Sequence, residues 1–112
     1  MDSERLAEMF KALGNPHRLH IFLRLVNCCP PSKRWVAEGA GRACVGELGR
    51  ALGIVPSTVS HHIKELQRAG LIATERNGQT IECWVDPEAM RALAAFFNHP
   101  PAAPGNEAAC VR

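Results

Sequence analysis

The sequence lacks any long apolar run, and no stretch approaches the roughly 18 residues that a membrane-spanning helix requires. It also lacks a basic, apolar and small-residue leader, so we expect a cytoplasmic protein with no membrane partner. A net charge of only +2 excludes a histone-like polycation. Any affinity for nucleic acid must therefore come from where the cations lie. No internal repeat is visible, and 112 residues is the length of a single domain.

The chain also lacks the groups of residues that enzymes use. There is no nucleophile with an evident base and orienting partner, no glycine-rich phosphate loop and no pair of acids suited to catalysis. The five cysteines are an odd number in a chain without an export signal, which favours reduced thiols over a disulfide framework. The sequence therefore predicts a protein that is not an enzyme and needs no obligatory cofactor.

The strongest pattern lies in residues 56–70, which predict a helix with one apolar and one polar side. At about 100° per residue, Val59, Ile63 and Leu66 fall within one narrow sector. The opposite side carries short hydroxyls, an imidazole and two cations, which bind phosphate oxygens and base edges in the major groove. These side chains are those of Ser57, Ser60, His61, Lys64 and Arg68. For this segment taken alone, an ordinary amphipathic surface helix is the alternative.

The segment before this helix completes a helix-turn-helix. Residues 45–52 carry a second apolar stripe and end at Gly53, which can take a positive φ at a helix C-terminus. Pro56 suits the first turn of the next helix because its missing N–H is not needed there. Two short helices joined by such a turn, with the second contacting DNA bases, are typical of this motif.

The segment after this helix predicts a β-hairpin. Residues 71–76 and 79–85 resemble strands, and Asn77-Gly78 between them predicts a type I′ turn with both residues at its centre. A helix-turn-helix followed by a hairpin is a winged helix, and Arg76 and Gln79 at the tip can then reach the DNA backbone or the minor groove. The predicted DNA-binding residues are therefore Ser57, Thr58, Ser60, His61, Lys64, Arg68, Arg76 and Gln79.

The flanking segments predict the remaining helices. A helix with Asn15 as its N-cap is apolar over most of its circumference, which indicates central burial. The first and last helices have more apolar surface than a small core needs, so we assign them to a dimer interface. Their stripes consist of Leu6, Met9, Phe10, Leu13, Met90, Leu93, Ala94 and Phe97.

The predicted fold class is mainly α with a small β-hairpin, a dimeric winged helix-turn-helix of element order α-α-α-α-β-β-α. We expect one DNA-binding and dimerisation domain over residues 1–99 and a flexible tail over residues 100–112, where prolines and a glycine end regular structure.

Placed together, these elements resemble the ArsR/SmtB family of bacterial winged-helix repressors over roughly residues 4–97. The matching segments are residues 12–19, the Ser57–His62 reader, residues 69–72 and the Arg76–Gly78 wing. The resemblance implies a homodimer that binds an inverted repeat overlapping a promoter and blocks transcription. It also implies release when an inducer, usually a metal or metalloid, binds the dimer.

The cysteines are the main indication of which inducer is bound. Arsenic-sensing members of the family carry Cys-Val-Cys-Asp-Leu at the first helix of the helix-turn-helix, whereas residues 44–48 here have only Cys44. Cys28 and Cys29 provide substitute thiols, so we predict a Cys28/Cys29/Cys44 site for As(III), Sb(III) or an organoarsenical. A helix N-terminus favours the thiolate form at Cys44, and binding there would act directly on the helix-turn-helix.

Other interpretations of the thiols stay open. Cysteine is among the most buried residue types, so these thiols can simply be small hydrophobic groups. Cys83 fits a core thiol better than a ligand, and Cys110 fits an unstructured residue. The same fold can also sense oxidants or persulfides through paired cysteines, although adjacent Cys28 and Cys29 would form a strained disulfide.

Several histidines and acids have competing explanations as well. The family's zinc sensors use ligands on the last helix, but here Glu88 and Ala102 replace two of them, and Asp86 has a structural task at the helix start. His17 and His20 are explained equally well by packing and by phosphate contact. His62 lies beside the apolar sector of residues 56–70, so we expect it to be partly buried.

Overall fold

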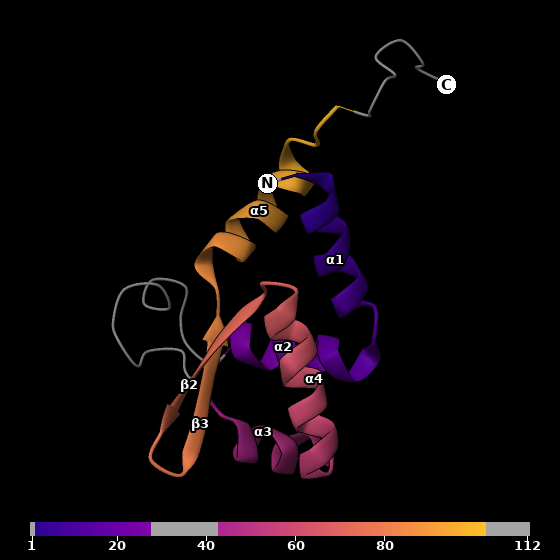
Figure 1. Cartoon of the computed structure of the whole chain (residues 1–112). Helices are drawn as coiled ribbons and strands as arrows, with labels where there is room; N and C mark the ends of the chain where they lie inside the picture. The colour runs from indigo at the N-terminus through magenta and orange to yellow at the C-terminus, as the bar shows by residue number, and fades with distance from the viewer. Residues whose placement is uncertain (1, 28–42, 103–112) are drawn as a thin grey trace.

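The computed structural model describes residues 2–27 and 43–102, which form five helices and three strands (Figure 1). The helices are α1 (Ser3–Leu13), α2 (Pro16–Asn27), α3 (Val45–Leu52), α4 (Pro56–Arg68) and α5 (Pro87–Asn98). The strands are β1 (Ala43–Cys44), β2 (Ile72–Asn77) and β3 (Thr80–Val85). This order confirms the predicted winged helix-turn-helix and adds β1, which the sequence did not predict.

Side-chain caps fix where α2 and α5 begin. Asn15 Oδ1 accepts hydrogen bonds from the backbone N–H groups of His17 and Arg18, at 2.9 and 3.1 Å. Asp86 Oδ1 accepts from the N–H of Glu88 at 2.9 Å. Each cap satisfies N–H groups that the helix itself leaves without a partner, and stabilises the fold by about 1 kcal/mol. Both N-caps are as the sequence predicted.

The three strands form one antiparallel sheet in the order β1-β3-β2. Strands β2 and β3 make the hairpin, in which Asn77 pairs with Thr80. Gly78 has a φ of 68°, whereas no non-glycine residue of the described chain has a positive φ. The turn therefore has Gly78 and Gln79 at its centre, in the pattern of a type II′ turn. The predicted type I′ turn centred on Asn77-Gly78 was wrong by one residue, because Asn77 belongs to the ladder.

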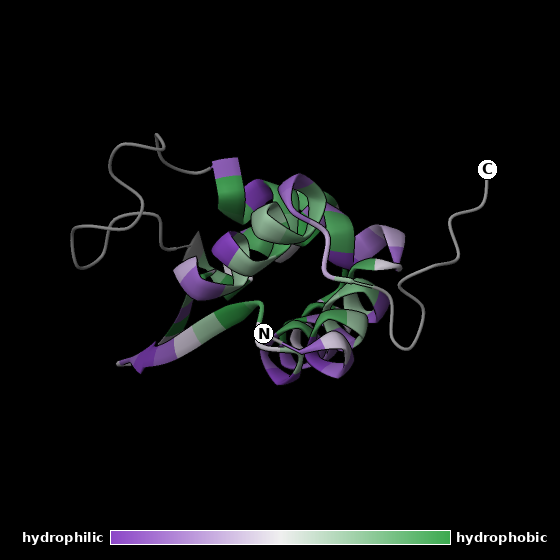
Figure 2. Cartoon of the chain, turned by 90° about the horizontal axis from the view of Figure 1, so that it is seen from above, coloured by the Kyte–Doolittle hydropathy of each residue, from purple (hydrophilic) through white to green (hydrophobic). Residues whose placement is uncertain are grey.

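The core lies where the inner sides of α1, α2 and α4 meet the base of the sheet. Its largest fully buried side chains are those of Met9, Ile21, Val59, Leu66, Leu71 and Cys83. Helix α2 is buried on one side only, since Leu19 and Leu23 are 40% and 46% exposed, so the expectation of central burial holds for half of its surface. The hairpin changes from hydrophobic at its base to hydrophilic at its tip (Figure 2).

The elements are divided between two ends of the molecule. Helices α1 and α5 converge at one end, and α3, the N-terminal part of α4 and the hairpin tip lie at the other (Figure 1). None of the helices in the described ranges is long and apolar enough to cross a membrane. Because of this division between two ends, a ligand of the helix-turn-helix meets a surface that is distant from the converging ends of α1 and α5.

Candidate nucleic-acid interface

Helix α4 is divided into a buried side and an exposed side, as predicted. Val59, Ile63 and Leu66 are 1%, 5% and 0% exposed. The exposed side is formed by Ser57, Ser60, His61, Lys64 and Arg68. Of the predicted contacts on this helix, only Thr58 is half-buried. The helix can thus contact a ligand along its polar side without giving up the packing that holds it.

Helix α3 packs closely against α4 because a glycine lies between them. A Cβ atom at Gly49 would lie 3.0 Å from Val59 Cγ2 and 3.1 Å from the carbonyl oxygen of Ile54, so a larger residue would push the helices apart. Gly53 ends α3 in the left-handed conformation, with a φ of 68°, and Pro56 stands in the first turn of α4. The roles predicted for Gly53 and Pro56 are confirmed.

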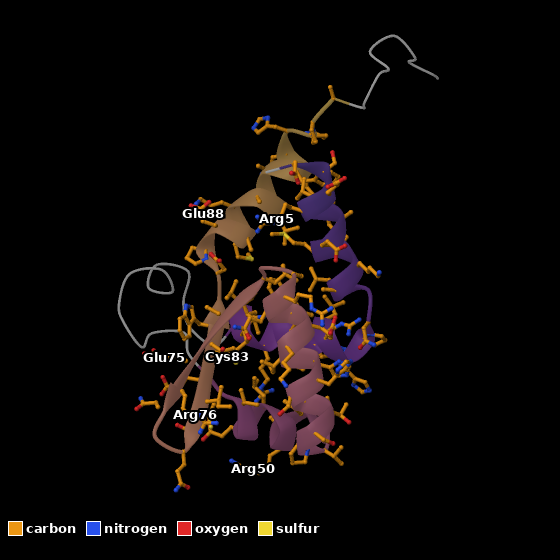
Figure 3. The ribbon with its side chains drawn as sticks, viewed as in Figure 1. Arg5, Arg50, Glu75, Arg76, Cys83 and Glu88 are labelled. Atoms are coloured by element: carbon orange, nitrogen blue, oxygen red, sulfur yellow. The ribbon has the colours of Figure 1, made fainter. Side chains whose placement is uncertain are left out.

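The hairpin places Arg76 and Gln79 at its exposed tip, as predicted. Figure 3 labels Arg76 on the hairpin. Arg76 Nη1 lies 3.5 Å from the carbonyl oxygen of Gly78, a distance at the outer limit of a hydrogen bond. Thr80 Oγ1 donates to the carbonyl oxygen of Asn77 at 2.8 Å and stiffens the turn. The turn is therefore fixed, while the guanidinium of Arg76 is only weakly held and can turn toward a phosphate.

The cations on α4 are exposed and lightly restrained. Arg68 Nη2 lies 3.1 Å from Glu65 Oε2, and the Arg68 side chain is 76% exposed. Exposed pairs of this kind stabilise a protein by only about 0–1 kcal/mol. A DNA phosphate can replace the Glu65 carboxylate at little cost.

His62 differs from the rest of this surface because it is buried, at 7% exposed, which is more complete than the partial burial that the sequence predicted. Burial lowers the pKa of His62 from its ordinary value of 6.5, and the neighbouring Arg18, His61 and His17 lower it further. Its Nδ1 atom has no hydrogen-bond partner among the described residues. Burial and the basic neighbours of His62 thus both favour the neutral form of its ring.

The two described thiols lie on neighbouring strands but on opposite faces of the sheet. Cys44 is half-buried at the N-cap of α3, and Cys83 is fully buried. In the pairing of β1 with β3, Ala43 lies opposite Cys83 and Cys44 opposite Glu82, and alternate residues of a strand point to opposite faces. The prediction of Cys83 as a core thiol is confirmed.

The predicted metalloid site cannot be traced beyond Cys44, because Cys28 and Cys29 lie outside the described residues, as does Cys110. Within residues 2–27 and 43–102, no group of three or more His, Cys, Asp or Glu side chains could hold a metal ion. Asp86, considered for zinc, caps α5 instead. The Cys28/Cys29/Cys44 site therefore stays a prediction.

Sequence reasoning missed three features that shape this interface. Strand β1 ties the start of α3 to β3, but two residues have no periodicity to detect. Arg50 of α3 is exposed and lines one groove with Ser60 of α4, so it adds a cation to the surface (Figure 3). Gly49 could have been found, because a glycine inside a helix costs about 1 kcal/mol relative to alanine and so indicates close packing.

Comparison with known proteins gives the same fold and a class of function. A family model described as a helix-turn-helix domain matches residues 13–75. The HTH-type transcriptional regulator YgaV of Escherichia coli (strain K12) is 30% identical over 97 residues, which cover 87% of this chain and 86% of YgaV.

Solved structures of other proteins have the same fold over nearly the whole of this chain. The crystal structure of an ArsR family transcriptional regulator matches with a TM-score of 0.68 and 26% identity, covering 88% of each chain. The transcriptional repressor BigR from Xylella fastidiosa matches with a TM-score of 0.61 and 25% identity, covering 90% of this chain and 91% of BigR. This chain therefore belongs to the helix-turn-helix family of DNA-binding transcriptional regulators, which are not enzymes, and has the winged-helix fold of its ArsR-type members.

Proposed function

We propose that this protein is a homodimeric repressor that binds an inverted repeat in an operator and leaves it when a thiophilic inducer binds. The observation that carries the proposal is the division of α4, with Val59, Ile63 and Leu66 buried and a row of hydroxyls, imidazole and cations exposed. The similarity to BigR, which is a transcriptional repressor, supports repression over activation.

Aromatic residues where α1 and α5 converge support the dimer. The Phe10 ring lies 5.2 Å from the Phe96 ring and 5.8 Å from the Phe97 ring, centroid to centroid. Phe97 is nevertheless 68% exposed. Burying a phenylalanine side chain is worth about 1.5–3 kcal/mol, so a second copy that covers this cluster would stabilise both chains.

A dimer joined through α1 and α5 explains why an inverted repeat is the expected target. Two copies of α4 related by a two-fold axis enter successive major grooves, about 34 Å apart along the DNA. Each hairpin then carries Arg76 and Gln79 toward the backbone or the minor groove beside its half-site. The two half-sites are read by the same residues and so have the same sequence in opposite directions.

The position of Cys44 gives an inducer a direct route to the DNA-binding elements. This thiol stands at the N-cap of α3 and also in β1, which pairs with β3 of the hairpin. A ligand that draws Cys44 toward other thiolates would displace both the helix-turn-helix and the wing. As(III) and Sb(III) are soft, thiophilic ions that suit three thiolates, and Cys28 and Cys29 are the proposed partners.

Fluorescence anisotropy of the reduced protein on DNA from upstream of its own gene tests the proposal. We expect tight binding that micromolar As(III) or Sb(III) reverses, while Zn(II) has no effect. A triple Cys28→Ser, Cys29→Ser, Cys44→Ser variant should bind DNA but no longer release it, whereas the matched Cys110→Ser variant should release it normally.

Each part of the proposal has its own contrary result. Release by a persulfide donor alone would assign the thiols to redox sensing and overturn the metalloid inducer. Release of DNA from the triple variant would exclude Cys28, Cys29 and Cys44 as the inducer site. Failure of the wild-type protein to prefer any upstream inverted repeat over random DNA would overturn the repressor itself.

A further inference from the structure

We propose that the DNA interface extends beyond the helix-turn-helix and the wing to the first turn of α2, where His17 binds a phosphate beside the groove that α4 enters. Nothing in the helix-turn-helix motif itself requires this contact. The inference rests on the proposed entry of α4 into the major groove, and it adds a residue from a helix outside the motif.

Three imidazole rings form a continuous row from α2 to the exposed side of α4. The His17 ring lies 5.8 Å from the His62 ring, and the His62 ring lies 5.7 Å from the His61 ring, centroid to centroid. His17 and His61 at the two ends of the row are exposed, and His62 between them is buried. His17 is therefore one buried ring away from a predicted DNA-contacting residue.

The first turn of α2 is held in place on both sides, so His17 is positioned in advance of binding. The Asn15 side chain accepts from the N–H groups of His17 and Arg18. Arg18 Nε donates to the carbonyl oxygen of Ala12 in α1 at 2.7 Å, which ties the turn to the end of the preceding helix. A contact residue fixed before binding loses little conformational entropy when the ligand arrives.

The charges around this row favour an anion. The groups that lower the pKa of the buried His62 are Arg18 and His17 from α2 and His61 from α4, and all three are basic. The exposed Lys64 and Arg68 continue the same surface along α4. The Glu65 carboxylate of the same helix pairs with Arg68, and the other basic groups of this surface attract phosphate and raise the local concentration of a polyanion.

The dimensions of DNA explain why the contact would be to the backbone. An α-helix with its side chains is about 10–12 Å wide and fills a major groove of about 12 Å, so residues beside the helix meet the phosphates at the edge of the groove. Phosphate contacts fix orientation and add affinity, but they carry no sequence information. His17 is thus expected to strengthen binding equally on all sequences.

The test compares His17→Gln with His99→Gln, a matched change at an exposed histidine that ends α5. At about pH 6, His17→Gln should weaken the binding of operator and of random DNA alike by about three- to tenfold, because a phosphate contact is lost. The slope of log affinity against log salt should fall by about one. Under the same conditions, His99→Gln should bind both DNAs like the wild type and leave the salt slope unchanged.

A His17→Arg variant separates a phosphate contact from a structural role. Arginine carries a charge and donates hydrogen bonds to phosphate oxygens, so this variant should restore both the affinity and the salt slope. The inference would be overturned if His17→Gln, with an unchanged melting temperature, bound DNA like the wild type and with the same salt slope. That result would leave the proposed repressor function standing. Absence of DNA binding by the wild type would instead refute the proposed function on which the inference rests.

Discussion

Helices α4 and α5 have nearly the same length, 13 and 12 residues, but they are held in the molecule in opposite ways. Helix α4 buries Val59, His62, Ile63 and Leu66, whereas α5 buries only Ala89. Helix α5 nevertheless ends in Phe96 and Phe97 and carries several other apolar residues. Helix α4 is thus stabilised within its own chain, whereas the apolar side of α5 is the surface that a second copy of the chain would cover in the proposed dimer.

The largest effect is expected from the buried side of α4. Leu66 is 0% exposed, so Leu66→Ala should lower the free energy of unfolding by about 3 kcal/mol, through lost burial and the cavity that remains. Urea denaturation at fixed protein concentration measures this change. Leu23→Ala is the control, because Leu23 is 46% exposed and should cost less than about 1 kcal/mol. Equal losses in the two variants would contradict the account of how α4 is held.

A smaller effect, on assembly, is expected from α5. Phe97→Ala should weaken the dimer by about 2 kcal/mol, or about thirtyfold in the dissociation constant. Val55→Ala provides the matched control, since Val55 is 61% exposed but lies at the helix-turn-helix end. Analytical ultracentrifugation should show a change for the first variant and none for the second. A dimer insensitive to Phe97 would mean that the exposed side of α5 has another partner.

The exposed side of α4 should respond through DNA affinity alone. Lys64→Gln should weaken operator binding by about three- to tenfold at low salt and lower the salt slope by about one, because one phosphate contact is lost. Lys11→Gln removes another exposed lysine, from α1, and should change neither value. If both variants bind alike in anisotropy titrations, Lys64 does not face DNA.

The smallest effect concerns pH and the buried ring of α4. The pKa of His62 is lowered from 6.5, so the unfolded chain takes up the proton more readily than the folded one. The stability that His62 contributes is therefore complete above about pH 6.5 and declines as the pH falls below it. Urea midpoints at about pH 7 and about pH 5 should differ more for the wild type than for His62→Leu. If the wild type and His62→Leu showed the same pH dependence, His62 would not contribute to stability in this way.

The sequence was sufficient to predict the helices and the helix-turn-helix, because each depends on local patterns. The apolar sector of α4 repeats with the period of a helix, and Gly53 and Pro56 mark a turn whatever surrounds them. The hairpin was predicted for the same reason, but its turn was displaced by one residue. Asn-Gly is common at such turns, whereas the pairing of Asn77 with Thr80 is a property of the whole ladder.

Features that depend on distant residues were beyond prediction. Strand β1 forms because Ala43 pairs with Cys83, which lies far along the chain. A segment of two residues contains no pattern that predicts such a pairing. The nearness of His17 to His62 likewise follows from how α2 crosses α4. The exposed side of α4 was predictable because a polar side is defined by the buried one. The proposed thiolate site would combine residues from separate segments and has no such local basis.

The close approach of Gly49 to Val59 has a consequence for how new specificities arise. The spacing of the two helices is set by a missing side chain on α3 and one valine methyl on α4, both on the inner side of the motif. Residues on the outer side of α4 take no part in that spacing. The exposed positions that are proposed to contact bases can accordingly be exchanged to suit another operator while the scaffold stays constant. A duplicated copy of this chain could acquire a new target by changing a few exposed positions, without first having to recover a stable fold.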